Sequence, residues 1–106
     1  KKVIAFSKSF HGRTSLAVAA TDNPQIVAPI NQNEHIVFLP LNDTFAFDNA
    51  FSDDVACVII EGIQGVAGVY APTIPFLQHI EKACKAKNIP LILDEVQSGY
   101  GRTGKF

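Results

Sequence analysis

The sequence predicts an α/β domain with a mostly parallel sheet and flanking helices. Short apolar runs alternate with segments of helical periodicity, a pattern that favours right-handed crossovers between parallel strands. The run 55–60, Val-Ala-Cys-Val-Ile-Ile, lacks polar alternation and is typical of a parallel strand buried on both faces. Polar clusters at 7–14, 61–68 and 94–104 each follow a predicted strand, so we expect them to meet at one edge of the sheet.

The N-terminal part of the chain predicts a strand followed by a helix. Residues 2–6 form a β-branched and aromatic run that suits a buried strand, and small polar residues with a glycine break it over 7–12. The Leu, Ala and Val content of 14–21 favours a short helix. We expect the Asp-Asn-Pro sequence at 22–24 to end it.

The middle of the chain predicts a second strand and a second helix. Residues 36–39 form a short apolar strand that Pro40 ends. Asn42 and Asp43 are capping residues that signal the start of a short helix over 44–51. The apolar run at 55–60 then supplies the next strand.

The C-terminal part predicts a longer helix and a last strand. Thr73 is an N-cap for a helix that continues to about Lys87, and Asn88 can close it. Residues 91–93 form a short apolar strand that delivers Asp94 at its carboxyl end. One face of the predicted helix is apolar at helical spacing, and it comprises Phe76, Leu77, Ile80, Ala83 and Cys84.

Composition and charge narrow the classes of partner. Nine Lys and Arg against ten Asp and Glu give a net charge of -1. The chain therefore lacks the excess of positive charge that is typical of proteins that bind nucleic acid or anionic membranes. No apolar stretch approaches the roughly 20 residues that span a bilayer. The two cysteines, Cys57 and Cys84, lie in apolar segments and are interpreted as reduced core residues. We therefore expect a cytoplasmic protein that binds small molecules or protein, with no metal site.

Three motifs carry a family resemblance. They are Ser-Phe-His-Gly-Arg-Thr at 9–14, Glu-Gly-Ile-Gln-Gly-Val-Ala-Gly at 61–68 and Asp-Glu-Val-Gln-Ser-Gly-Tyr-Gly-Arg-Thr-Gly at 94–104. In this order they resemble the class III aminotransferases, which include the acetylornithine, ornithine and 4-aminobutyrate aminotransferases. The resemblance implies that residues 1–106 are an internal fragment of the large cofactor-binding domain of a fold-type I enzyme that uses pyridoxal phosphate (PLP).

The resemblance also implies which residues contact the cofactor. Asp94 matches the catalytic carboxylate that pairs with the pyridine nitrogen, a pairing that favours the charged pyridinium. Glu95, Val96 and Gln97 belong to the cofactor-binding segment, in which Val96 packs on one face of the ring and Gln97 bonds its phenolic oxygen. Phe10 matches the aromatic residue that stacks on the opposite face. Considered without the resemblance, Phe10 and Val96 are ordinary core residues and Asp94 is a turn aspartate or a helix cap.

Three further positions bear on the substrate and the chemistry. Arg13 matches the residue that contacts the substrate carboxylate in acetylornithine aminotransferases, with a structural ion pair as the alternative. His11 is interpreted as a supporting residue, because the family's proton carrier is a lysine. Val66 stands where many members of the family have a glutamate. The resemblance implies that this glutamate pairs with an arginine and masks it when the first substrate binds, and Val66 cannot form that pair.

The implied activity is transamination between N-acetyl- or N-succinylornithine and 2-oxoglutarate in arginine metabolism, by a homodimeric parent enzyme. Ornithine and 4-aminobutyrate aminotransferases and glutamate-1-semialdehyde aminomutases remain alternatives, as does a non-catalytic α/β fragment. Neither end of the chain looks like a natural terminus. The Schiff-base lysine is expected downstream and the phosphate-binding loop upstream, so we expect the fragment to be inactive alone.

Overall fold

The sheet is parallel throughout. The computed structural model describes residues 1–64 and 70–96. Its four strands lie in the order β2-β1-β3-β4, and every neighbouring pair is parallel. The strands are β1 (Lys2–Phe6), β2 (Ile36–Leu39), β3 (Val55–Glu61) and β4 (Leu91–Asp94). The predicted α/β fold class is therefore confirmed, and each predicted strand is present within one residue of its expected bounds.

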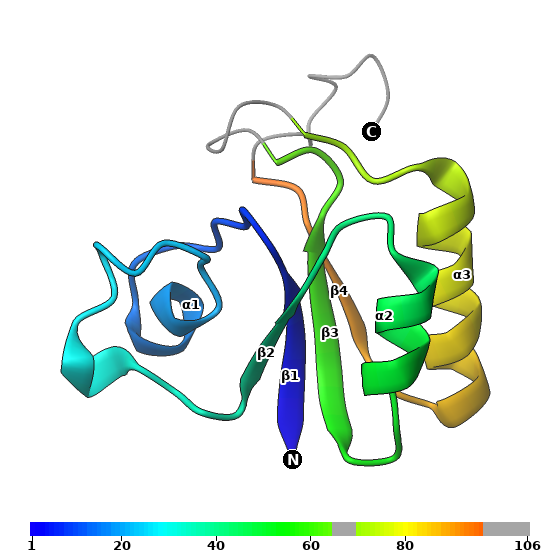
Figure 1. The fold of residues 1–106 in the computed structure, drawn as a ribbon, viewed down its shortest axis with the longest axis horizontal. Helices are drawn as coiled ribbons and strands as arrows, with labels where there is room; N and C mark the ends of the chain where they lie inside the picture. The colour runs from blue at the N-terminus through cyan, green and yellow to red at the C-terminus, as the bar shows by residue number, and fades with distance from the viewer. Residues whose placement is uncertain (65–69, 97–106) are drawn as a thin grey trace.

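Helices lie on both sides of the sheet. Figure 1 shows α1 (Ser15–Ala19) on one side and both α2 (Thr44–Ala50) and α3 (Ile74–Lys87) on the other. A single 3-10 turn, η1 (Pro29–Asn31), lies between α1 and β2 and was not predicted. Its Pro at the first turn suits a helix start, but a three-residue turn has no periodicity for sequence analysis to detect. No helix in residues 1–64 and 70–96 has both the length and the apolar character that crossing a membrane requires.

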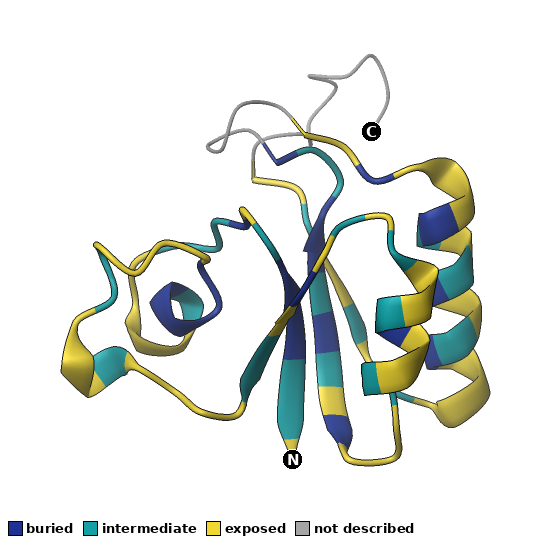
Figure 2. Cartoon of the chain, in the orientation of Figure 1, coloured by how far each residue is buried: buried dark blue, intermediate teal, exposed yellow. Residues whose placement is uncertain are grey.

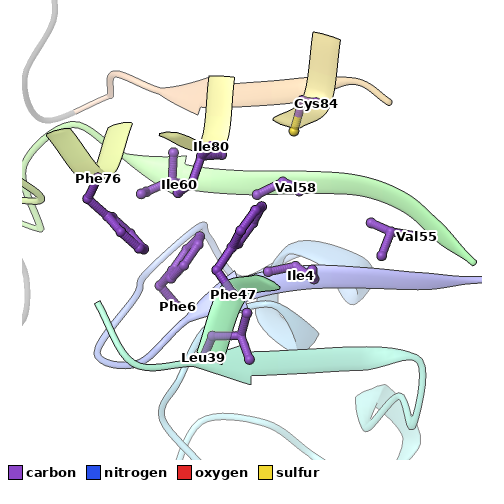
Figure 3. Close-up of a cluster of buried hydrophobic side chains, with 10 residues drawn as sticks. All are labelled: Ile4, Phe6, Leu39, Phe47, Val55, Val58, Ile60, Phe76, Ile80 and Cys84. Atoms are coloured by element: carbon purple, nitrogen blue, oxygen red, sulfur yellow. The ribbon is translucent and has the colours of Figure 1, made fainter. Parts of the chain in front are cut away.

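The main core lies between the sheet and the helices α2 and α3 (Figure 3). The ring of Phe6 meets that of Phe76 edge to face, with centroids 5.7 Å apart. Phe47 is fully buried and stacks on Phe51 at 5.0 Å. This arrangement anchors both helices to the strands through large aromatic side chains. The buried members of this cluster are Ile4, Phe6, Leu39, Phe47, Val55, Val58, Ile60, Phe76, Ile80 and Cys84.

The strand β3 is covered on one face more than on the other. Val58 and Ile60 are buried and belong to the core beneath α2 and α3, whereas Cys57 and Ile59 are half-buried. Figure 2 shows this alternation along the strand. The prediction that this run is buried on both faces is therefore not met within residues 1–64 and 70–96. The physical reason is that α1 is only five residues long and covers a small part of the second face.

Polar caps set the ends of α3 as the sequence predicts. The hydroxyl of Thr73 accepts a hydrogen bond from the N–H of Phe76 at 3.3 Å. At the other end Asn88 adopts a left-handed conformation, with φ 56° and ψ 42°, which lets the chain turn away from the helix axis. The chain then returns through Pro90 to start β4.

Asp43 offers a direct test of capping at α2. Its Oδ1 accepts a hydrogen bond from the N–H of Ala46 at 2.9 Å. Because this bond satisfies a free donor of the first helical turn, Asp43→Ala should lower the free energy of unfolding by about 1 kcal/mol. Asp43→Asn retains an acceptor at the same place and should lower the free energy of unfolding much less. Urea denaturation of both variants measures the difference, and equal losses would show that the bond does not cap the helix.

Candidate functional site

The described parts of the three polar clusters meet at the carboxyl edge of the sheet. The side-chain amide of Gln64 donates to the carbonyl oxygen of Ser7 at 3.0 Å. The N–H of Phe10 donates to Oε1 of Glu61 at 2.9 Å. Nδ1 of His11 lies 2.8 Å from Oδ2 of Asp94. These contacts join the segment after β1 to the ends of β3 and β4, as the parallel sheet predicts.

The carboxylate of Asp94 is held in one orientation by two groups. Oδ2 faces the imidazole of His11, and Oδ1 accepts a hydrogen bond from the N–H of Val96 at 3.1 Å. The Asp94 side chain is 14% exposed, so it is shielded from bulk water but can still be reached. A carboxylate of this kind can pair with a cationic group brought to the edge of the sheet.

The imidazole of His11 is almost completely buried, with its side chain 1% exposed. Its backbone N–H donates to the hydroxyl of Thr21 at 2.9 Å, which fixes the loop after β1 against the end of α1. Donation to Asp94 requires a proton on Nδ1. Nε2 is buried and has no hydrogen-bond partner within residues 1–64 and 70–96. His11, predicted only as a supporting residue, thus has Asp94 as its specific partner.

Glu61 lies beside Asp94 in the register of β3 and β4 and is 3% exposed. Burial raises the pKa of the Glu61 carboxyl, and the neighbouring charge of Asp94 raises it further. The hydrogen bond from the N–H of Phe10 and the nearby His11 act in the opposite direction, but burial is the largest effect. Glu61 was predicted only as part of the motif at 61–68, because no sequence pattern indicates that its carboxyl accepts a hydrogen bond from the backbone of Phe10.

The raised pKa of Glu61 makes stability depend on pH. The folded chain binds this proton more tightly than the unfolded chain, whose carboxyl has the ordinary pKa of 4.5. The contribution of Glu61 to stability should therefore fall as the pH rises from about 4.5 through the raised pKa of the folded state. Glu61→Gln keeps an oxygen acceptor for Phe10 and cannot ionise. Its stability relative to the parent chain should increase between about pH 4 and about pH 7, which urea denaturation at both pH values measures.

A matched control separates this effect from general charge effects. Glu34 lies in a loop, and its side chain is 89% exposed. Glu34→Gln should leave the pH dependence of the unfolding free energy as it is in the parent chain. If Glu61→Gln gives a curve parallel to that of the parent, burial of Glu61 does not control the pH dependence.

The remaining predicted residues lie around this pair of carboxyls. Phe10 is half-buried, and Arg13 and Glu95 are exposed. Val96 is 83% exposed and follows the partly buried Asp94 by two residues. Arg13 forms no ion pair with any residue in 1–64 or 70–96. The alternative prediction, that Arg13 forms a structural ion pair, is therefore not met within these residues. Gln97 lies outside the described residues, as do Val66 and the rest of the motif that begins at Asp94.

Charged side chains in the described part of the chain do not gather as a metal site would require. Residues 1–64 and 70–96 hold no group of three or more His, Cys, Asp or Glu side chains placed to bind one ion. The contact between His11 and Asp94, with the buried carboxyl of Glu61 in register beside Asp94, brings an imidazole and two carboxyl groups together, which suits acid-base chemistry and charge pairing.

Comparison with known proteins gives consistent matches over the whole chain. The family model described as "Aminotransferase class-III" matches residues 1–106. The acetylornithine aminotransferase of Methanopyrus kandleri is 44% identical over 99% of this chain, and that of Bacillus subtilis is 42% identical over 98%. The matched regions are 27% and 28% of those two proteins, so the chain spans about a quarter of the length of these relatives.

Solved structures agree with the sequence comparison. The ornithine aminotransferase of Toxoplasma gondii superposes with a TM-score of 0.87 at 30% identity, covering 98% of this chain and 25% of that protein. A second structure of that enzyme is described as having partial occupancy of PLP at its active site. The N-acetylornithine aminotransferase of Stenotrophomonas maltophilia superposes with a TM-score of 0.73 at 30% identity, over 98% of this chain and 23% of that protein.

Proposed function

The chain belongs to the class III aminotransferases, and from this premise we propose that the complete protein is a PLP-dependent aminotransferase whose large cofactor-binding domain contains residues 1–106. We further propose that it is a cytoplasmic homodimer. The lysine that binds the cofactor covalently and the loop that binds its phosphate are proposed to lie in other parts of the protein. On this proposal the isolated chain does not transaminate, and borohydride treatment with PLP should label no single lysine stoichiometrically.

The observation that carries the proposal is the orientation of Asp94. Its carboxylate is partly buried, has donors on both oxygens and remains accessible at the edge of the sheet. These properties fit the residue that would pair with a protonated pyridine nitrogen. When bound, PLP supplies an electron sink for the carbon that bears the substrate amine. The part of Asp94 is to stabilise the positive charge on the ring, and the part of His11 is to keep the carboxylate oriented.

The neighbours of Asp94 supply apolar surface and hydrogen-bonding groups for a flat ring. Val96 is 83% exposed directly after the acid, so an apolar group placed on it would remove that side chain from water. Phe10 is half-buried, and the bond from its N–H to Glu61 fixes its backbone. We assign the two ring faces to Phe10 and Val96, and further cofactor contacts to Glu95 and Gln97. Side chains of Phe10 and Val96 in these positions would also exclude water from the reacting carbon.

The proposed amino donor is an N-acylated ornithine, with 2-oxoglutarate as acceptor. The amine of the donor is transferred in a first half-reaction that leaves an aldehyde, and 2-oxoglutarate receives it in a second. Relatives named acetylornithine aminotransferase support this choice. So does Arg13, an exposed guanidinium without an ion pair in residues 1–64 and 70–96, which can hold a substrate carboxylate through two hydrogen bonds.

Ornithine itself is the second candidate donor. The T. gondii ornithine aminotransferase has a TM-score of 0.87 to this chain, which favours it. Val66 opposes it, because this side chain cannot form the glutamate–arginine pair that the family resemblance associates with ornithine and 4-aminobutyrate enzymes. The acyl donor therefore remains the leading proposal.

A panel of donors tests the proposal in the complete protein. Turnover is measured with N-acetylornithine, N-succinylornithine, ornithine, 4-aminobutyrate and glutamate-1-semialdehyde, each with 2-oxoglutarate. The highest kcat/KM is expected for one of the two acylated ornithines. Preference for free ornithine would establish the second candidate, and turnover of the semialdehyde without an acceptor would indicate an aminomutase.

Arg13 provides a residue-level test of substrate binding. A lysine keeps the charge but cannot form the two parallel hydrogen bonds of a guanidinium with a carboxylate. Arg13→Lys should therefore raise the KM for the donor about tenfold, since losing one charged hydrogen bond costs about 1.5 kcal/mol. Steady-state kinetics measures the change, with Lys82→Arg on the exposed face of α3 as the control. An unchanged KM would remove Arg13 from the substrate site.

A further inference from the structure

The chain makes a tight turn over residues 7–11, directly after β1. Lys8 has a φ of 65° in this turn, in the left-handed region that side chains other than glycine rarely adopt. Such a conformation costs free energy and persists only where the surrounding structure fixes it. The turn also carries Phe10 and His11 to the candidate site. The residues that hold the turn therefore determine where the ring of Phe10 lies.

Every backbone N–H of residues 7–11 donates a hydrogen bond. Apart from one bond back to β1, the acceptors lie at the end of β2, at the end of β3 and in the segment that follows α1. Because these elements are separate, no one of them can move without breaking a bond to the turn. The acceptors, in order along the turn, are Leu39, Asp22, Phe6, Glu61 and Thr21, at distances from 2.7 to 3.1 Å.

Two buried polar side chains hold the turn from β3 and the residues after it. Oε1 of Glu61 accepts a hydrogen bond from the N–H of Phe10 at 2.9 Å, and Nε2 of Gln64 donates to the carbonyl oxygen of Ser7 at 3.0 Å. The backbone is therefore bonded on both sides of Lys8. Glu61 and Gln64 are both buried. Burial of such polar groups is costly unless they are hydrogen-bonded, and the backbone of the turn supplies a partner to each.

Gln64 and Lys8 are both in contact with Tyr70. The N–H of Gln64 donates to the carbonyl oxygen of Tyr70 at 2.6 Å, and the N–H of Tyr70 donates back at 3.2 Å. Nζ of Lys8 lies 4.2 Å from the centroid of the Tyr70 ring, which is a cation–π contact. Tyr70 therefore fixes the backbone of Gln64 and also contacts the strained residue of the turn.

We propose that Glu61 and Gln64 are positioning residues for the cofactor ring, which fix the turn 7–11 so that Phe10 lies in its stacking position before the cofactor binds. This inference rests on the proposed function, which assigns one face of the ring to Phe10. Neither Glu61 nor Gln64 contacts the cofactor in that assignment. A stacking surface that is already in place has no ordering cost on binding, so the two hydrogen bonds increase the affinity for the cofactor.

Matched substitutions in the complete protein separate the hydrogen bonds from the charge. Glu61→Gln and Glu61→Leu both remove the charge, but only Glu61→Leu removes the acceptor for Phe10. Gln64→Met is similar in size to the parent side chain and removes the donor for Ser7. Asp43→Ala controls for a general loss of stability, because the capping bond that it removes lies at the start of α2.

Hydrogen exchange in the cofactor-free protein measures how firmly the turn is held. The rate for the amides of residues 7–11 is taken relative to the rate for those of α3, by mass spectrometry of peptides. This ratio should rise about tenfold in Glu61→Leu and Gln64→Met, because each loses a buried hydrogen bond to the turn. It should stay within about twofold of the parent in Glu61→Gln and Asp43→Ala. A parental ratio in both Glu61→Leu and Gln64→Met, or in whichever of them folds, would overturn the proposal.

Titration with pyridoxal phosphate tests whether the turn acts through Phe10. The Kd of the complete protein for the cofactor should rise about tenfold in Gln64→Met and stay within about twofold of the parent in Asp43→Ala. Without the aromatic ring, in Phe10→Leu, the further change Gln64→Met should raise the Kd less than about twofold. An equal rise with and without the ring, or no rise at all, would overturn the positioning role alone. A parent protein that binds no pyridoxal phosphate would instead reject the proposed function, and the positioning role with it.

Discussion

Replacing Asp94 with Asn in the complete protein should lower kcat/KM about 10- to 1000-fold. An opposite charge at close range shifts the pKa of its partner by about 1 to 3 units, and each unit corresponds to about 1.36 kcal/mol. If that free energy is lost from the transition state, each 1.36 kcal/mol costs a factor of ten in rate. The amide of Asn keeps the size of the side chain and removes only its charge. Steady-state kinetics with the preferred donor measures the loss.

The control for Asp94 is an aspartate far from the carboxyl edge of the sheet. Asp53 pairs with Lys87 at 2.7 Å, and its side chain is 91% exposed. Asp53→Asn should leave kcat/KM within twofold of the parent, because exposed pairs contribute little. The cofactor content of each variant is measured alongside, so that loss of PLP is separated from loss of turnover. A full rate for Asp94→Asn would reject the assignment of Asp94 to the pyridine nitrogen.

Phe47→Ala should lower the free energy of unfolding by about 3 to 5 kcal/mol. Phe47 is fully buried, stacks on Phe51 and meets the ring of His79 edge to face at 6.0 Å. Truncation to Ala removes the contacts that fix α2 against α3 and leaves a cavity that the surrounding chain fills only in part. Urea denaturation followed by circular dichroism measures the change.

A second phenylalanine of the same helix serves as the control. Phe45 is 77% exposed, so Phe45→Ala should change the free energy of unfolding by less than about 0.5 kcal/mol. The two substitutions delete the same atoms from one helix and differ in burial. Similar losses at both positions would mean that burial of Phe47 does not stabilise the core.

Local features of the fold were predictable because each depends on residues close in sequence. The caps Asp43 and Thr73 both hydrogen-bond an N–H three residues later, and Asn88 adopts the left-handed conformation that ends a helix. The apolar strand runs also appear at their expected places. Such signals need no knowledge of the rest of the molecule.

The order of the strands was not predictable in the same way. β1 lies between β2 and β3, so the first strand of the described chain pairs with two strands that are distant from it in the sequence. Alternation of apolar residues gives the faces of a strand but not its partners. The same limit applies to the cover over β3, where the continuous apolar run predicts two covered faces and residues 1–64 and 70–96 cover one of them more fully.

In the candidate site, the residues were predictable from the sequence but their contacts were not. The family motifs give the identity of Asp94, Phe10 and Arg13, since these are read directly from short segments. The pairing of His11 with Asp94 and the bond from Phe10 to Glu61 join segments that are 83 and 51 residues apart. Contacts over such separations depend on strand order, which explains why His11 had no predicted partner.

The strand order also has a consequence for how the chain reaches its native state. None of the parallel pairs can close through a tight hairpin, because each requires a crossover between its strands. During synthesis β1 emerges first among these strands but must wait for β3 before its second edge can pair. Asp94 ends the last strand, so its contact with His11 cannot form until the ribosome has released nearly all of this segment. We therefore expect slow, non-local folding in which the contact between His11 and Asp94 forms after the strands have paired.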